Sequence, residues 1–277
     1  MTLGGLPPLR EALEAHGLLA RKSLGQHFLL DLNVTRKIAR LAGPLDGLRV
    51  IEVGPGPGGL TRALLEAGAQ VVAVEKDARF LPLLEDLAAA APGRLQVVVA
   101  DALDVDEAKL VGNGPAAVVS NLPYNVGTPL LLKWLTGSFR PVSMTLMFQK
   151  EVALRIIASP DSEAYGRLAV IAQACARTEK VMDVGARAFT PPPRVDSAVV
   201  RLDPRSDAPA ARRLAALQAV TAAAFGQRRK MLRQSLKGLG GEALCAVAGL
   251  SPQARAETIS VTGFLDLADA WLAQRGR

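Results

Sequence analysis

Leu48-Arg-Val-Ile-Glu-Val-Gly-Pro-Gly-Pro-Gly-Gly59 is the stretch that decides the fold of this 277-residue chain. Its first six residues read as a short buried strand, and a glycine loop separates them from a helix expected over Leu60–Ala67. The next expected strand is Gln70–Glu75, so that Glu75 stands 21 residues after Gly54. A glycine loop between strand and helix, followed by a strand that ends in a carboxylate, is typical of a doubly wound nucleotide-binding sheet.

The glycine loop is compatible with two kinds of cofactor. Gly54, Gly56 and Gly59 satisfy the G-x-G-x-x-G pattern of a dinucleotide site. The two prolines between them each remove a backbone N–H that such a site would use to bind pyrophosphate. S-adenosylmethionine has no phosphate, and the carboxylate of Glu75 could accept from both hydroxyls of its ribose. The loop therefore favours S-adenosylmethionine over a nicotinamide dinucleotide.

The alternation of strands and helices continues well beyond this unit. Further strands are expected at Leu95–Ala100, Ala116–Ser120 and Ser143–Phe148, and further helices from Asp77, after Pro129 and over Gln149–Ala176. This order predicts an α/β fold with a mostly parallel sheet covered on both faces. Lys180–Val184 and Asp196–Leu202 are joined by a proline-rich turn that leaves no room for a crossover helix, which predicts an antiparallel hairpin at the sheet edge.

Helical segments flank the expected sheet at both ends of the chain. Near the start, one helix is expected from Pro7 to Gly17 and a second is expected to begin at a capping Asp31. After a linker at 203–209, several short helices are expected. We therefore expect three parts: a helical arm at 1–45, the sheet domain at 46–204, and a small all-α domain at 205–277.

Asn121-Leu122-Pro123-Tyr124 follows the expected strand Ala116–Ser120 and suits chemistry on the exocyclic amine of adenine. That nitrogen is a poor nucleophile because its lone pair is delocalised into the ring. Two acceptors, the side-chain oxygen of Asn121 and the carbonyl of Leu122, would draw it toward a nucleophilic geometry, and Tyr124 would stack on the base. The alternative is an ordinary turn that begins at Asn and is stiffened by Pro123.

The carboxyl ends of parallel strands meet at one crevice, so Gly54, Glu75, Asp101 and Asn121 are expected to face the same cleft. Asp101 could accept from the adenine amine of the cofactor, while Ala102 leaves space for the ring. The alternative role for Asp101 is to cap a following helix.

Phe189 opens the proline-rich turn and could serve as a second stacking surface for an extruded base. The turn would also stiffen the hairpin, whatever its function. The stretch from Phe225 to Lys237 carries no acidic residue and five basic ones: Arg228, Arg229, Lys230, Arg233 and Lys237. Three of them, at positions 229, 233 and 237, recur at helical spacing and could present one face to phosphates, although a solvated helix face is the alternative.

Charge and composition narrow the class of partner. The net charge is +7, and residues 205–277 hold 11 Lys and Arg against 5 Asp and Glu, whereas residues 1–204 hold 22 against 21. A basic end on a nearly neutral body indicates a nucleic-acid partner. Two His and two distant Cys give no expectation of a metal site, and without a signal peptide or a long apolar run we expect a cytoplasmic protein.

Taken together, these motifs resemble the ribosomal RNA adenine N6,N6-dimethyltransferases, and most closely their bacterial small-subunit group. The segments that carry the resemblance are Lys22–Leu29, Glu52–Thr61, Val74–Asp77, Asn121–Asn125, Gln149–Val152, Tyr165–Leu168, Phe189–Leu202 and Phe225–Leu236. The resemblance implies a class I methyltransferase domain followed by a small helical RNA-binding domain. It also implies a monomer that transfers four methyl groups, two to each of two adjacent adenosines, in a hairpin loop near the 3′ end of 16S rRNA in the small ribosomal subunit.

Carried over by position, the resemblance places the cofactor against His27, Leu29, Gly54, Glu75, Asp101 and Asn121. His27 departs from the family pattern, which often has Asn there; by itself it reads as a structural residue. Competing hypotheses are a large-subunit rRNA methyltransferase, a DNA adenine methyltransferase and a non-catalytic ribosome-assembly factor. A dehydrogenase is disfavoured by the prolines of the glycine loop.

Overall fold

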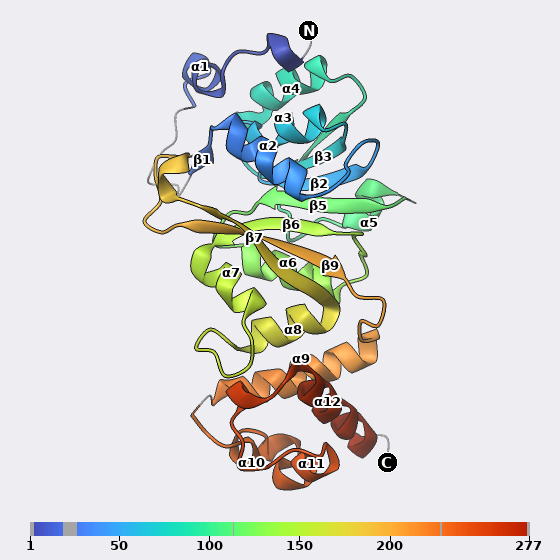
Figure 1. The fold of residues 1–277 in the computed structure, drawn as a ribbon. Coiled ribbons are helices and arrows are strands. Elements are labelled where there is room, and N and C mark those ends of the chain that lie inside the picture. The colour runs from blue at the N-terminus through green and yellow to red at the C-terminus, as the bar shows by residue number, and fades with distance from the viewer. Residues whose placement is uncertain (1–2, 19–26, 113, 228, 276–277) are drawn as a thin grey trace. The chain divides into compact units, whose positions relative to one another are not determined.

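The computed structural model describes residues 3–18, 27–112, 114–227 and 229–275 (Figure 1). Their contacts divide the chain into two compact units. The first holds the residues up to Ala153 together with Glu179–Leu202, and the second holds Leu154–Thr178 and the chain from Asp203 onward. The second unit thus takes in residues 154–178, which the sequence had grouped with the sheet domain.

The first unit contains a seven-stranded sheet in the order β4-β3-β2-β5-β6-β9-β7. Strands β2, β3, β4, β5 and β6 run parallel, and β9 pairs antiparallel with β6. A separate two-stranded sheet joins β1 to β8. The strand bounds are β1 Phe28–Leu29, β2 Arg49–Val53, β3 Gln70–Glu75, β4 Leu95–Val99, β5 Ala116–Asn121, β6 Met144–Gln149, β7 Ala176–Val184, β8 Phe189–Thr190 and β9 Ser197–Pro204.

The helices follow the expected alternation with the strands. Their bounds are α1 Leu9–Ala15, α2 Leu32–Leu41, α3 Gly59–Glu66, α4 Leu81–Ala90, α5 Glu107–Val111, α6 Gly127–Thr136, α7 Lys150–Ile157, α8 Arg167–Cys175, α9 Ala211–Gly226, α10 Leu232–Ser235, α11 Gly241–Val247 and α12 Val261–Arg275. Short 3-10 turns occur at η1 Leu3–Gly5, η3 Ala78–Phe80, η4 Ala186–Ala188, η5 Lys237–Leu239 and η6 Ala256–Thr258.

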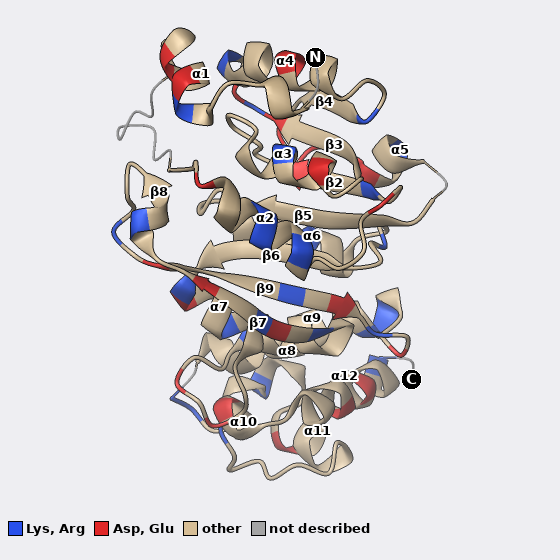
Figure 2. Cartoon of the chain, turned by 45° about the horizontal axis from the view of Figure 1, so that its top comes forward, with Lys and Arg blue, Asp and Glu red and all other residues tan. Residues whose placement is uncertain are grey.

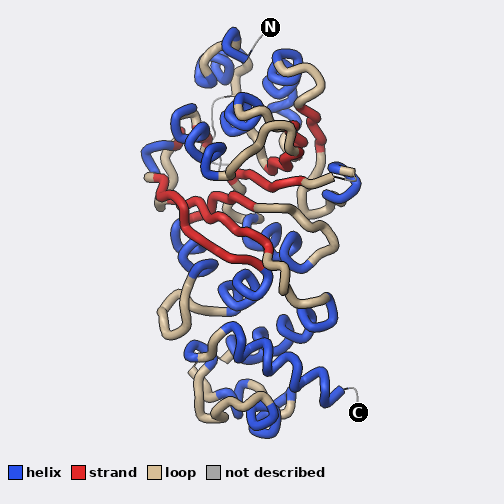
Figure 3. Tube along the Cα trace, turned by 45° about the vertical axis from the view of Figure 1, so that its right-hand side comes forward, coloured by secondary structure: helices blue, strands red, loops and turns tan. Residues whose placement is uncertain are grey.

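The central strands β2, β3, β5 and β6 are buried on both faces of the sheet. Successive side chains along each strand point to opposite faces. Val50, Ala73 and Val119 belong to one core cluster, which α2 and α3 cover. The opposite face is covered in part by α6, because a Cβ at its first residue, Gly127, would lie 3.2 Å from the ring of Phe148. Figure 3 shows blue helices on both sides of the red strands. The expected two-faced, mostly parallel sheet is confirmed.

Several elements agree with the sequence-based expectations, and others differ. Strand β3 has the expected bounds, and the Asp31 side chain caps α2 by accepting from the N–H of Asn33. Helix α6 begins at Gly127, two residues before Pro129, because proline fits the first turn of a helix, where its missing N–H has no partner to lose. The pairing of β1 with β8 was not expected, since each strand has only two residues. In the edge hairpin, β9 lies next to β6 and β7 is outermost.

The second unit is a helical bundle organised around α9 and α12. Arg213 on α9 donates two hydrogen bonds to the carboxylate of Asp269 on α12, at 2.9 and 2.7 Å. Tyr165 is fully buried and donates to the carbonyl of Ile259 at 2.8 Å. Its ring meets that of Phe225 edge to face, with the centroids 6.0 Å apart. Because the buried hydroxyl of Tyr165 has a hydrogen-bond partner, its ring can pack in the aromatic core of this unit without leaving a polar group unpaired.

The expectation that Arg229, Arg233 and Lys237 share one helix face is wrong. Helix α9 ends at Gly226, and α10 spans only four residues. The chain between them pairs elsewhere, because Met231 forms an antiparallel bridge with Arg255 and the N–H of Leu232 donates to Ala254. This tertiary pairing overrides the helical spacing of the sequence. Arg228 lies outside the described residues.

No helix in the described part of the chain is long and apolar enough to cross a membrane. Within the same residues, no group of three or more His, Cys, Asp or Glu side chains is arranged to hold a metal ion.

Replacing Gly59 by Ala should destabilise the first unit. A Cβ at this position would lie 2.6 Å from the carbonyl oxygen of Leu29, so α3 and β1 would have to separate. We expect a loss of about 1–3 kcal/mol in the free energy of unfolding, which urea denaturation would measure. Gly226→Ala is the matched control, because a Cβ there meets nothing within 4 Å. Equal stability of the Gly59→Ala and wild-type proteins would contradict the close approach.

Candidate active site

The ends of β2 and β5 lie side by side and bring two conspicuous motifs of the sequence together. In their parallel register, Ile51 lies beside Val118, and the buried hydroxyl of Ser120 donates to the carbonyl of Val53 at 2.6 Å. The chain then turns at Gly54, whose φ of 68° suits glycine. A Cβ at Gly54 would lie 3.2 Å from Cγ of Pro123. The glycine loop and the Asn-Leu-Pro-Tyr motif are therefore in direct contact.

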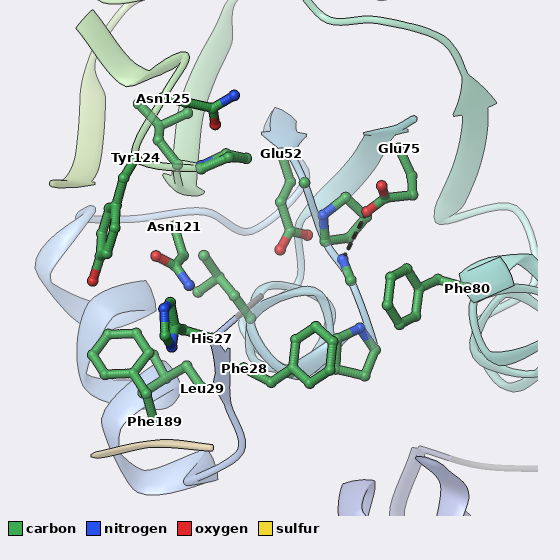
Figure 4. A pocket seen from close by; sticks show the side chains of 18 residues that line it. His27, Phe28, Leu29, Glu52, Glu75, Phe80, Asn121, Tyr124, Asn125 and Phe189 are labelled. Atoms are coloured by element: carbon green, nitrogen blue, oxygen red, sulfur yellow. Dashed lines mark hydrogen bonds between the residues drawn. The ribbon is translucent and has the colours of Figure 1, made fainter. Parts of the chain in front are cut away.

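A cavity of about 510 Å³ opens at these strand ends. Figure 4 shows that Asn121, Tyr124, His27 and Phe189 gather at one end, whereas Glu75 and Phe80 lie at the other, with Glu52 between them. The remaining lining residues are Phe28, Leu29, Gly54, Pro55, Gly56, Pro57, Gly59, Leu60, Leu122, Pro123 and Asn125. Most of the expected site residues of the sheet domain thus line a single cavity.

Glu75 is held in place by the backbone of the glycine loop. Its Oε2 accepts from the N–H of Gly56 at 3.0 Å and its Oε1 accepts from the N–H of Asp77 at 2.8 Å. The side chain is only 7% exposed, and burial raises its pKa above the ordinary value, against these hydrogen bonds. Each oxygen keeps a further lone pair, so the carboxylate can still accept from two neighbouring hydroxyls of a ligand.

Glu52 is a second carboxylate in the cavity wall, and sequence reasoning did not select it. It is 2% exposed, and its Oε2 has no hydrogen-bond partner among the described residues. Burial raises the pKa of Glu52 to about 8; the Thr61 hydroxyl opposes this shift and the Glu75 carboxylate adds to it. A buried carboxyl with an unused oxygen would be stabilised in its charged form by a cationic ligand. The signal in the sequence was an acidic residue between Ile51 and Val53, in the apolar part of its strand.

The other end of the cavity is closed by the small β1–β8 sheet. Leu29 pairs with Phe189, which is 3% exposed, so the aromatic ring becomes part of the cavity wall. Nδ1 of His27 donates a hydrogen bond to the carbonyl oxygen of Pro191 at 2.8 Å. His27 therefore joins the segment before β1 to the proline-rich turn. Of the segment Lys22–Leu29 that carries the resemblance, residues 22–26 lie outside the described residues.

Asp101 and Ala102 do not line this cavity. Oδ2 of Asp101 accepts from Nζ of Lys76 at 2.7 Å and Oδ1 accepts from the N–H of Leu103 at 3.0 Å, which lowers the pKa of Asp101. The alternative role as a helix cap is also not observed, because Asp106 caps α5. Asp101 instead stabilises a turn. A role of Asp101 toward an adenine ring stays a prediction.

Comparison with known proteins identifies the family. Residues 17–272 match the family model described as ribosomal RNA adenine dimethylase. The chain belongs to this family. It is 70% identical to ribosomal RNA small subunit methyltransferase A of Phenylobacterium zucineum over 275 residues, which cover 99% of this chain and 96% of that protein. The corresponding protein of Caulobacter vibrioides is 69% identical over 254 residues, 92% of this chain and 98% of its own.

Solved structures agree with the class I methyltransferase fold. The 23S rRNA methyltransferase ErmE superposes with a TM-score of 0.69 at 27% identity and covers 88% of this chain and 98% of its own. A dimethyladenosine transferase from Plasmodium falciparum superposes with a TM-score of 0.73 at 23% identity, and the match covers 87% of this chain and 96% of that one. As a ribosomal RNA adenine dimethylase, the protein is an S-adenosylmethionine-dependent enzyme. The cavity fits this cofactor, because Glu75 can accept from two neighbouring hydroxyls and Oε2 of the buried Glu52 has no partner among the described residues, which would suit a cation.

Glu52→Gln should change how the stability of the cofactor-free protein depends on pH. The pKa of Glu52 is about 8 in the folded protein, whereas the ordinary value, which applies to the unfolded chain, is 4.5. The neutral side chain therefore contributes to the stability of the fold below pH 4.5, and this contribution is lost as the pH rises toward 8. The Gln variant keeps a neutral side chain. We expect equal free energies of unfolding at pH 4.5 and a clear advantage for Glu52→Gln at pH 9, measured by urea denaturation. A pH-independent difference would contradict this assignment.

Proposed function

We propose that the protein dimethylates N6 of two adjacent adenosines in a hairpin loop near the 3′ end of 16S rRNA. The substrate is the small ribosomal subunit or its precursor, and the protein acts on it as a cytoplasmic monomer. The choice of subunit is supported by the relatives at about 70% identity, which are named for the small subunit. ErmE, named for 23S rRNA, is 27% identical.

The lining of the cavity supports a placement for most of the cofactor. Glu75 accepts from the ribose hydroxyls, since its two oxygens are already oriented by Gly56 and Asp77. His27 and Leu29 bind the methionine end. Asp101 and Ala102, which do not line the cavity, are assigned to the adenine from the sequence alone. When bound, S-adenosylmethionine supplies an electrophilic methyl group on a positively charged sulfur. The buried carboxylate of Glu52 favours that charge.

The single observation that carries the reaction type is the position of Asn121 beside the glycine loop. Its side-chain oxygen and the carbonyl of Leu122 accept from the two hydrogens of the target amine, while Tyr124 and Phe189 stack on the base. Each transfer forms one bond from N6 to carbon, breaks one bond from sulfur to carbon and releases one proton. The proton leaves easily once the nitrogen is quaternised, so the mechanism needs no strong general base.

Methyl transfer to isolated ribosomal particles tests the proposal. Small subunits that lack these modifications, large subunits and duplex DNA are each incubated with the enzyme and labelled S-adenosylmethionine. We expect label only in adjacent N6,N6-dimethyladenosines of the small subunit. Label in the large subunit would replace the proposal by an ErmE-like activity, and binding without transfer would favour an assembly factor.

Asn121→Ala should slow the first methyl transfer more than the second. The unmodified amine has two hydrogens to donate, whereas the monomethylated amine has one and can engage only one acceptor. Loss of the Asn121 oxygen should therefore reduce the rate of the first transfer more than that of the second. The reduction should be about tenfold if one hydrogen bond to the reacting amine is lost. Single-turnover rates on unmodified and on monomethylated RNA would measure this. Equal losses in the two steps would refute the two-acceptor mechanism.

The RNA backbone is bound by the basic residues that follow α9. Arg229, Lys230, Arg233 and Lys237 are exposed and form no ion pair with another described residue, and the turn between α9 and α10 is blue in Figure 2. Arg228 is assigned the same role from the sequence alone. Although these residues do not share a helix face, their charges need only reach phosphates.

Replacing Arg233 and Lys237 together by Ala should weaken binding of small-subunit RNA and lower its salt dependence. If each contacts one phosphate, the slope of log K against log salt should fall by about 0.7–0.9 per residue. Filter binding at several salt concentrations would measure the slope. Arg205→Ala is the control, because Arg205 is paired with Asp207 at 2.8 Å. An unchanged slope in the double variant would exclude these two contacts.

A further inference from the structure

The hydroxyl of Tyr124 is hydrogen-bonded to a side chain that has so far been given no role. Its oxygen lies 2.8 Å from Oγ of Ser197, within hydrogen-bond distance. Ser197 is fully buried at the start of β9, where it pairs with Gln149 of β6. The partner of Tyr124 therefore stands at the start of a strand whose backbone is paired with β6, which limits how far Ser197 can move.

This bond restrains the position of the Tyr124 ring. The ring is attached to the backbone at one end and is held by Ser197 at the other, so rotation about the Cα–Cβ bond would break the hydrogen bond. Burial raises the pKa of Tyr124, so its hydroxyl stays protonated and both groups keep a hydrogen to donate. The ring is thus fixed before a base arrives, and stacking does not require it to be ordered again.

The two methyl transfers depend on this ring to different degrees. In the first transfer, the base is oriented by stacking and by two hydrogen bonds from its amine. In the second, the N6-methyl group has replaced one of those hydrogens, so only one hydrogen bond remains. Stacking on Tyr124 must then supply more of the alignment, and any freedom of the ring misplaces the nitrogen.

We propose that Ser197 is a positioning residue that, through Tyr124, determines whether the reaction proceeds from monomethyl- to dimethyladenosine. The proposal deepens the proposed function, because it assumes that N6 of adenosine is the target. Ser197 itself does not touch the substrate. It acts only by holding the phenol.

The test is the ratio of products formed by Ser197→Ala. The enzyme is incubated with unmodified small subunits, and the nucleosides of the digested rRNA are quantified over time by mass spectrometry. We expect the second transfer to slow by about fivefold, the loss that one hydrogen bond between neutral groups produces, and the first by less than half that factor. N6-monomethyladenosine should accumulate. Equal slowing of both transfers would overturn the proposal.

Three further variants separate positioning from a general loss of packing. Tyr124→Phe lacks the hydroxyl and should give the same product ratio as Ser197→Ala, while the double variant should show no further change. Ser197→Thr keeps a hydroxyl and should restore dimethylation. Ser143→Ala removes another buried serine, just before β6, and should leave the ratio unchanged. If Ser197→Ala still alters the ratio when residue 124 is Phe, Ser197 does not act through Tyr124.

A binding measurement without the cofactor gives an independent readout. A short RNA with 2-aminopurine at the target position loses fluorescence when the base stacks on an aromatic ring. Ser197→Ala should quench this probe less than the wild type at saturating enzyme, and equal quenching would count against a fixed ring. Wild-type enzyme that yields no dimethyladenosine would refute the proposed function itself, whereas wild-type dimethylation with an unaltered Ser197→Ala ratio would refute only the role of Ser197.

Discussion

The contact between the backbone of Gly54 and the ring of Pro123 is the constraint on which the site depends. It exists because β2 and β5 are neighbours in the sheet, and because the hydroxyl of Ser120 holds the end of β5 to the carbonyl of Val53. No side chain fits between the two loops: a Cβ on Gly54 would lie 3.2 Å from Pro123. The glycine loop and the Asn-Leu-Pro-Tyr motif therefore form one continuous wall of the cavity.

The electrostatics of the cavity are opposite to those of the protein as a whole. The chain carries a net charge of +7, whereas the acidic side chains in the cavity wall are Glu52 and Glu75. Because burial raises the pKa of Glu52 to about 8, its carboxyl is mostly neutral at pH 7 in the empty cavity, and a cation beside it would favour its ionisation. A phosphate would gain nothing from either acid, and the prolines have removed N–H groups that could bind it. The buried acids thus support the choice of cofactor that the glycine loop had indicated.

Much of the fold and of the site followed from periodicity and from strand ends. Glu75 and Asn121 were predictable because the carboxyl ends of parallel strands share one crevice, whatever the tertiary detail. Glu52 was missed because a carboxylate inside an apolar strand gives no periodic signal of its own. The pairing of Leu29 with Phe189 was not predictable, because each of the two strands has only two residues. Nor was the position of Asp101 outside the cavity, where its carboxylate pairs with Lys76.

The basic residues show the limit of the helical pattern most clearly. Arg229 and Arg233 are spaced like neighbours on a helix, but Met231 between them pairs with Arg255. A single backbone bridge to a distant segment outweighs the weak preference of a few residues for helix. Spacing in the sequence can therefore indicate which residues carry charge without indicating the surface that they form.

The position of β9 has a consequence for the order in which the protein is made. The five parallel strands and most of the cavity wall come from residues up to 149, whereas β9, with Ser197, emerges from the ribosome about fifty residues later and must pair back onto β6. Because a strand can pair only after it has been synthesised, the hydroxyl of Tyr124 has no partner until Ser197 has left the ribosome. Anchoring of this ring is therefore among the last steps in the assembly of the first unit.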